Sequence, residues 1–115
     1  MATLIPESGN LVLRLARWEK LGSFHGDLTF PITAVQDVDV SQQPFREIRG
    51  LRAPGTGVPG RVALGTWRYR GGKDFVAVYR GQPAVVVRLR DAPFRRLVVS
   101  SDDADALATA IRSAI

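Results

Sequence analysis

The chain contains no cysteine and only one histidine, and both scarcities exclude chemistry. Without cysteine there can be no disulfide, no thiolate zinc site and no cysteine nucleophile, a composition typical of a reducing compartment. His25 alone would have to serve any acid–base or imidazole metal site, and the following Gly26 and Asp27 indicate a turn residue instead. We therefore expect a cytoplasmic protein with no catalytic residues, no metal and no cofactor.

Long apolar runs are missing as well. The longest, such as residues 84–87, are far too short to cross a bilayer, and residues 1–10 lack the basic start and unbroken apolar stretch of a secretory signal. With 115 residues, 45% of them apolar and 23% charged, the chain has the composition of a globular protein and the length of one domain, residues 1–115. We expect one domain that is neither secreted nor membrane-spanning.

Lysine is scarce, whereas arginine is abundant and concentrated in the middle of the chain. Residues 46–96 hold twelve basic and three acidic side chains, and the remainder holds four basic and eight acidic ones. Such an asymmetry can create a surface that attracts phosphate or carboxylate groups. A solvated arginine-rich face that only keeps the domain in solution is the alternative.

The amino-terminal part predicts short strands with one ambiguous segment. Leucines alternate with Val12 and Arg14 over residues 11–15, which predicts the first strand. Apolar residues then recur every third position, so residues 17–22 form either one helical turn or a bent continuation of that strand. Strand periodicity returns at residues 28–30 and, after a short turn anchored by Ile32 and Val35, again at residues 37–40, where Asp37 and Asp39 share the solvent-exposed face. The alternation of apolar and polar residues along a half-buried strand accounts for this acidic pair, so no catalytic pair or calcium site is inferred from it.

Prolines and glycines interrupt residues 41–61 so often that no regular element is predicted there. A loop of this length in a small domain is usually functional or packed by its own side chains. It is our first candidate for a contact surface, and the residues that we assign to it are Phe45, Arg49, Leu51 and Arg52. Residues 55–60 also match the G-x-G-x-x-G pattern, but a strand-like run follows them where a dinucleotide site needs a helix.

Four apolar runs and one helix are predicted after this loop. The runs cover residues 62–69, 74–79, 84–90 and 94–100, and turns too short for a helical crossover join them. We therefore expect antiparallel neighbours and no parallel pairing. Ser101 or Asp102 is expected to cap the final helix, whose apolar stripe comprises Leu107, Ala108, Ile111 and Ile115.

Basic side chains recur on three of these predicted strands. If the strands are neighbours, several guanidinium groups converge on a surface that suits phosphate, nucleic acid or anionic lipid. A solvated face is the more ordinary interpretation. The candidate residues are Arg68, Arg70, Lys73, Arg88, Arg90, Arg95 and Arg96.

In its order of elements the chain resembles the bacterial pleckstrin-homology-like domains and uncharacterised small proteins of high-GC bacteria. The resemblance is carried by residues 28–32, by Gly65-Thr66-Trp67, by Lys73-Asp74-Phe75, by residues 84–87 and by the final helix. It implies a mainly β fold, an antiparallel bent sheet or barrel that a carboxy-terminal helix caps. Residues 23–29 lack the arginines and lysines with which eukaryotic members hold inositol phosphates. The resemblance therefore implies a protein-binding or assembly module.

The hypothesis that follows is a non-catalytic binding module that contacts a protein through residues 43–60 or through an exposed sheet edge. Binding of an anion or nucleic acid through the arginines is the second hypothesis. A small enzyme with its site in a barrel mouth ranks last. Edge strands could also pair two copies into a homo-oligomer, although no residue pattern selects that outcome.

Overall fold

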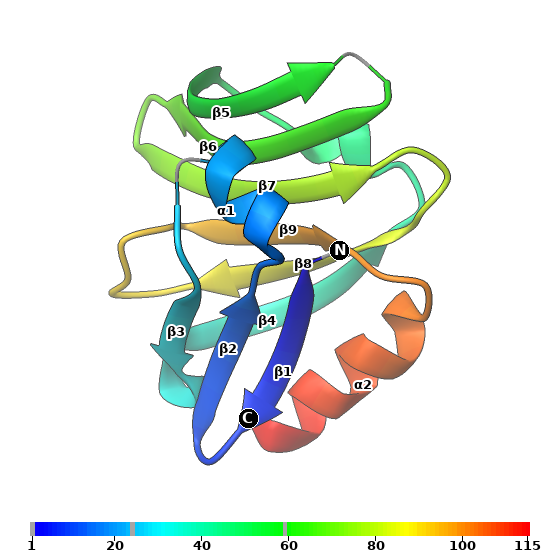
Figure 1. The fold of residues 1–115 in the computed structure, drawn as a ribbon. Helices are drawn as coiled ribbons and strands as arrows, with labels where there is room; N and C mark the ends of the chain where they lie inside the picture. Colours follow the sequence, from blue (N-terminus) through cyan, green and yellow to red (C-terminus); the bar gives the residue numbers. More distant parts are fainter. Residues whose placement is uncertain (1, 24, 59) are drawn as a thin grey trace.

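The computed structural model describes residues 2–23, 25–58 and 60–115, except for the side chains of residues 52–54. Its described part is mainly β, with a three-stranded sheet, a six-stranded sheet and a carboxy-terminal helix (Figure 1). The predicted mainly β fold with a terminal helix is confirmed. The two sheets bend over one another and do not close into a barrel.

The three-stranded sheet is antiparallel in the order β1-β2-β3, with β1 at Thr3–Glu7, β2 at Asn10–Arg14 and β3 at Leu28–Pro31. The sequence prediction did not include β1, because Pro6 interrupts it. Proline is tolerated in this strand because β1 lies at a sheet edge, where a missing N–H costs no ladder bond. Between β2 and β3, the short helix α1 at Arg17–Ser23 settles the ambiguous segment in favour of a helix.

The six-stranded sheet has the order β4-β8-β9-β7-β6-β5. Its strands are β4 at Val35–Ser41, β5 at Leu51–Val58, β6 at Val62–Tyr69, β7 at Gly72–Tyr79, β8 at Ala84–Leu89 and β9 at Arg96–Ser100. A single 3-10 turn, η1 at Ile32–Ala34, separates β3 from β4 and carries the chain from one sheet to the other. Strands β6, β7, β8 and β9 correspond to the four predicted carboxy-terminal strands, which are all present.

One pairing differs from the prediction, because β7 and β9 run parallel, with Phe75 opposite Leu97. The hairpin of β8 and β9 is oriented so that β9 lies between β7 and β8. Residues 80–83 connect β7 to β8 across the intervening β9. They therefore need to span only two strand spacings, about 10 Å, which four residues can do. The short connections predicted the direction of consecutive strands but not the insertion of a third strand between two of them.

The segment predicted to be an irregular loop contains a 3-10 helix, η2 at Pro44–Glu47, and the edge strand β5. The pairing of β5 with β6 shifts register between Arg52 and Gly55. At Gly55 a Cβ atom would lie 2.4 Å from the Leu64 carbonyl oxygen, so the close approach of the two strands requires glycine there. The prolines and glycines thus mark a bulge and an edge rather than a loop.

Helix α2 at Ala104–Ala114 packs against β1, β4 and β8 and closes one side of the core. Its N-cap is Asp103, whose side chain accepts a hydrogen bond from the Ala106 N–H, so the predicted caps Ser101 and Asp102 were wrong. Ala108 and Ile111 are buried as predicted, whereas Ile115 is 58% exposed. The apolar stripe ends one turn earlier than its sequence pattern indicated.

Candidate functional site

The six-stranded sheet is apolar on both faces, but the two faces are covered unequally. The three-stranded sheet, α1 and α2 cover the inner face, which carries Leu64, Phe75, Val87 and Leu97 (Figure 1). The outer face carries a second apolar cluster, and the apolar side chains that pack against it among the described residues are Phe45 of η2 and Ile48, which follows η2. The members of this cluster are Ala63, Trp67, Val76, Val78, Ala84, Val86 and Val98.

A buried charge network holds η2 on the outer face. Asp74 is fully buried on β7, and its carboxylate accepts hydrogen bonds from Arg49, Arg96 and Tyr69 at 3.0, 3.0 and 2.6 Å. Arg96 also contacts the side chain and the backbone carbonyl of Glu47, the last residue of η2. These five residues, which we call the Asp74 cluster, join β6, β7 and β9 to the segment that precedes β5. Burial and the hydrogen bond to Asp74 raise the pKa of Tyr69.

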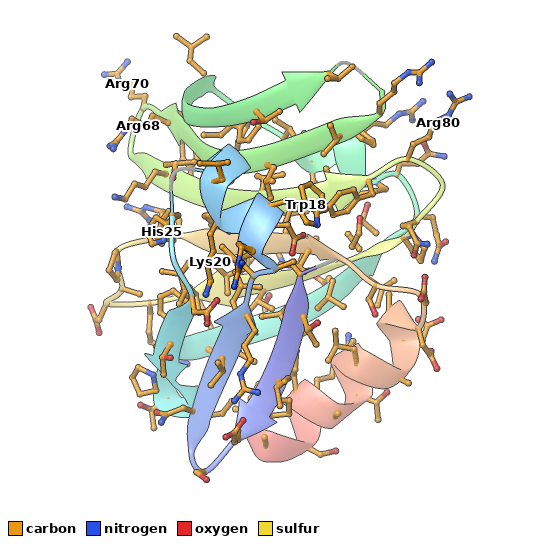
Figure 2. All side chains as sticks on the ribbon, viewed as in Figure 1. Trp18, Lys20, His25, Arg68, Arg70 and Arg80 are labelled. Atoms are coloured by element: carbon orange, nitrogen blue, oxygen red, sulfur yellow. The ribbon has the colours of Figure 1, made fainter. Side chains whose placement is uncertain are left out.

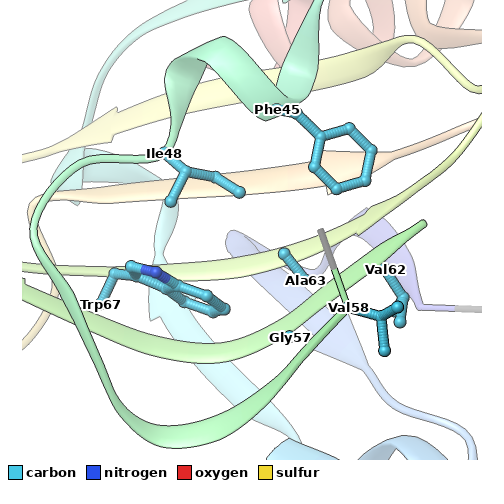
Figure 3. A pocket seen from close by; sticks show the side chains of 7 residues that line it. All are labelled: Phe45, Ile48, Gly57, Val58, Val62, Ala63 and Trp67. Carbon is cyan, nitrogen blue, oxygen red and sulfur yellow. The ribbon is translucent and has the colours of Figure 1, made fainter. Parts of the chain in front are cut away.

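Beside η2 the outer face contains an apolar hollow of about 300 Å³ (Figure 3). Phe45 and Ile48 form one wall, Trp67 and Ala63 form the floor, and the hairpin of β5 and β6 forms the opposite wall at Val58 and Val62. Because Trp67 is buried while Val58 is 44% exposed, the hollow opens at the end of the edge strand β5. Its size suits one large apolar side chain rather than an extended ligand.

Large exposed apolar side chains gather on two neighbouring elements. Trp18 and Leu21 of α1 are 54% and 78% exposed, and Leu51 of β5 is 79% exposed. Helix α1 contacts β5, where the Thr56 hydroxyl donates a 2.7 Å hydrogen bond to the Gly22 carbonyl. We call Trp18, Leu21, Leu51 and Val58 the apolar rim; among the described residues the other large exposed apolar side chain is Ile115. Clustered exposure of this kind marks interaction surfaces.

The other sheet edges are shorter or better protected than β5. In β4 the register shifts after Val35, Asp37 and Asp39 are exposed beside the edge, and Arg112 of α2 donates a hydrogen bond to the Val38 carbonyl. Edge β1 contains a proline and lies against α2, and edge β3 has only four residues. Charges, bulges and covering elements are the usual protection of an edge against an added strand. β5 also contains a proline, Pro54, and a register shift, and with eight residues it is the longest of these edges.

Helix α1 is anchored by a buried carboxylate. Glu19 is fully buried and accepts hydrogen bonds from the Ala16 N–H at 2.7 Å and from the Tyr79 hydroxyl. The first of these bonds is the reciprocal half of a capping box, which stabilises the helix start. The Trp18 ring then packs edge-on against Tyr79, with the ring centroids 5.8 Å apart. The exposed side chains of α1 are therefore held on a fixed support.

Replacing Tyr79 by phenylalanine is expected to lower the free energy of unfolding by about 1–3 kcal/mol, because the buried Glu19 carboxylate loses a donor. Burial and this hydrogen bond raise the pKa of Tyr79 above its ordinary value of 10. The folded state therefore holds the phenolic proton more tightly, and the resulting stabilisation is present below pH 10 and lost as the pH rises further. Urea denaturation at neutral and alkaline pH measures both effects, and unchanged stability of the variant would contradict them.

The predicted basic residues divide into two groups. Arg96 is buried in the Asp74 cluster, and Arg88 bridges Asp37 and Asp39 at 2.9 and 2.6 Å, which raises the pKa of Arg88. Arg68, Lys73 and Arg95 line one hollow between the β6–β7 and β8–β9 turns, and Arg90 lines an adjoining one with Arg95. Arg68 and Arg70 extend from the same end of the sheet, whereas Arg80 lies at the opposite end (Figure 2).

The predicted loop residues are placed differently from one another. Phe45 packs on the outer face, Arg49 joins the Asp74 cluster and lies 4.2 Å from the Tyr69 ring centroid, and Leu51 belongs to the apolar rim. The side chain of Arg52 lies outside the described part of the structure. Sequence reasoning did not identify Trp18 or Leu21 as surface residues, because their three-residue spacing indicated only a helical turn or a bent strand and not which side is exposed.

The single histidine lies among core aromatics, with its ring edge-on to Phe75 and Phe94 at centroid distances of 5.6 and 5.8 Å. Within the described residues there is no cluster of potential metal ligands and no helix long and apolar enough to span a membrane. No family model, curated protein or solved structure matches the chain. The pleckstrin-homology-like resemblance therefore stays a prediction, and the parallel pair of β7 and β9 departs from the antiparallel sheet that it implies.

Proposed function

We propose that this protein is a non-catalytic cytoplasmic binding module that captures an extended apolar segment of a partner protein along β5. The observation that carries the proposal is the apolar rim, which places four of the five large exposed apolar side chains on β5 and the adjacent α1 within the described residues. Because β5 ends the six-stranded sheet, a partner strand can pair with its backbone.

Side chains of an added strand alternate between the two faces of a sheet, and β5 offers an apolar contact on each. Leu51 is exposed at one end of β5, where it pairs with Arg68, and Leu21 is exposed on α1, the helix that contacts β5. At the other end of β5, on the outer face, lies the apolar hollow. A partner segment of about eight residues would span the distance between these two contacts at 3.3 Å per residue.

Selection of peptides from a random library displayed on phage, with the immobilised protein as bait, tests the proposal. The expected result is enrichment of peptides in which large apolar residues alternate with polar ones over six to eight positions, about the length of β5. Enrichment of acidic peptides without such alternation would assign binding to the arginines instead. Failure to enrich any sequence above an unrelated protein would contradict the proposal.

A further inference from the structure

The hollow between the β6–β7 and β8–β9 turns, which we call the basic cleft, has a volume of about 540 Å³ and is lined by Arg68, Lys73 and Arg95. Its other lining residues are Tyr69, Gly71, Gly72, Ala92 and Pro93, so the lining contains no acidic side chain. The described lining of the adjoining hollow includes one acidic residue, Asp91, together with Arg90 and Arg95. The cleft is therefore a concentration of positive charge at one end of the sheet.

Two of the three cations are directly opposed across the hairpin. Arg68 pairs in register with Lys73, so their side chains leave the same face of neighbouring strands. The carboxylate next along β7, Asp74, points to the opposite face and is already bound by Arg49 and Arg96. The Arg68 and Lys73 side chains therefore line the cleft from one face of the sheet.

Arg95 and Lys73 are held in place by the structure. Arg95 Nε donates a 2.7 Å hydrogen bond to the Gly71 carbonyl, and the Arg95 stem packs so closely on Gly72 that a Cβ there would lie 2.7 Å from Arg95 Cγ. Lys73 Nζ lies 4.9 Å from the centroid of the Phe94 ring. Neither the terminal nitrogens of Arg95 nor the Lys73 ammonium has an acidic partner among the residues that the structure describes. Fixed donors of this kind bind oxyanions at a lower entropic cost than mobile ones.

We propose that the basic cleft binds a phosphate group that carries two or more negative charges. A planar guanidinium whose Nε is anchored presents its two terminal nitrogens, which match the spacing of phosphate oxygens, and the lysine adds a point charge. The volume admits a phosphorylated small molecule or the phosphate headgroup of a lipid. The site adjoins the apolar rim where Arg68 pairs with Leu51, but it does not depend on the function proposed above.

Titration of the ¹⁵N-labelled protein with pyrophosphate, at constant ionic strength, tests this site. We expect saturable shifts of the Gly71, Gly72 and Lys73 amides and an affinity that falls as salt rises. Lys73→Gln and Arg95→Gln are each expected to weaken binding about tenfold or more, because each removes one charge-assisted contact. Arg95→Lys keeps the positive charge but loses the paired terminal nitrogens of the guanidinium, and it is expected to weaken binding too.

Arg80→Gln is the matched control, because it removes the same charge at the opposite end of the sheet and is expected to leave the affinity unchanged. Thermal unfolding of each variant establishes that it is folded. Vesicles of phosphatidylcholine with and without phosphatidylglycerol distinguish a lipid headgroup from a soluble phosphate. If the protein is retained on the anionic vesicles and Lys73→Gln abolishes this retention, the ligand is a lipid headgroup. If the protein binds pyrophosphate but is not retained on the vesicles, the ligand is a soluble phosphate. Equal losses in Arg80→Gln and Lys73→Gln, or no saturable binding of either probe, would overturn the site.

Discussion

Replacing Asp74 by alanine is expected to lower the free energy of unfolding by about 3–5 kcal/mol, a large share of the stability of a domain of this size. The substitution removes the buried carboxylate partner of Arg96, which keeps its contact with Glu47, and it removes the acceptor of Arg49 and of the Tyr69 hydroxyl. Removing one partner of a buried ion pair costs more than the pair contributes, because the remaining charge stays desolvated. Urea denaturation followed by circular dichroism measures the change.

Asp39→Ala provides the control for this prediction, because it also removes a carboxylate from an arginine on the outer face. The Arg88–Asp39 pair is exposed, with side-chain exposures of 40% and 62%, so its loss is expected to cost at most about 1 kcal/mol. Similar destabilisation by both substitutions would mean that the Asp74 cluster is not a buried network. The segment from η2 to β5 would then need another explanation for its position.

Leu21→Asp combined with Leu51→Asp is expected to weaken binding of a selected peptide about a hundredfold, which is the second large effect. Covering one leucine is worth about 1.5–3 kcal/mol, and an aspartate at either position would be desolvated by the partner. Both leucines are almost fully exposed, so the free energy of unfolding is expected to change by no more than about 0.5 kcal/mol per substitution. Calorimetric titration of wild type and variant with the same peptide gives the ratio.

Ile115→Asp is the matched control for the apolar rim, since Ile115 is the large exposed apolar side chain of the described residues that lies away from it, at the end of α2. Its replacement is expected to leave the affinity for the peptide unchanged. If Ile115→Asp weakens binding as much as the double substitution does, the peptide recognises exposed apolar surface without preference for β5.

Much of the strand content could be predicted from the sequence, because alternation and short turns act locally. Residues 62–69 form β6 with the predicted bounds, and the terminal helix begins within three residues of its predicted cap. The pairing of β7 with β9 could not be predicted in this way. The order of the strands depends on which strand of the β8–β9 hairpin lies next to β7. Packing between residues far apart in the chain decides this.

The candidate site was only partly predictable. Leu51 was assigned to a contact surface through the proline and glycine content of its segment, although that segment is an edge strand and not a loop. Trp18 and Leu21 have the spacing of core residues, and only the placement of α1 leaves them exposed. Arg68 was predicted on a strand and Lys73 at the tip of the following hairpin, but their register and the approach of Arg95 appear only in the folded chain.

Chemical-shift mapping of the ¹⁵N-labelled protein with a selected peptide tests the role of β5 most directly. We predict that the largest shifts fall on Gly22, Gly55, Thr56 and the Trp18 indole, which lie on or beside the edge strand and the helix that it contacts. Shifts confined to β4 or to the turn at Gly71, with these signals unmoved, would contradict the assignment of β5 as the binding edge.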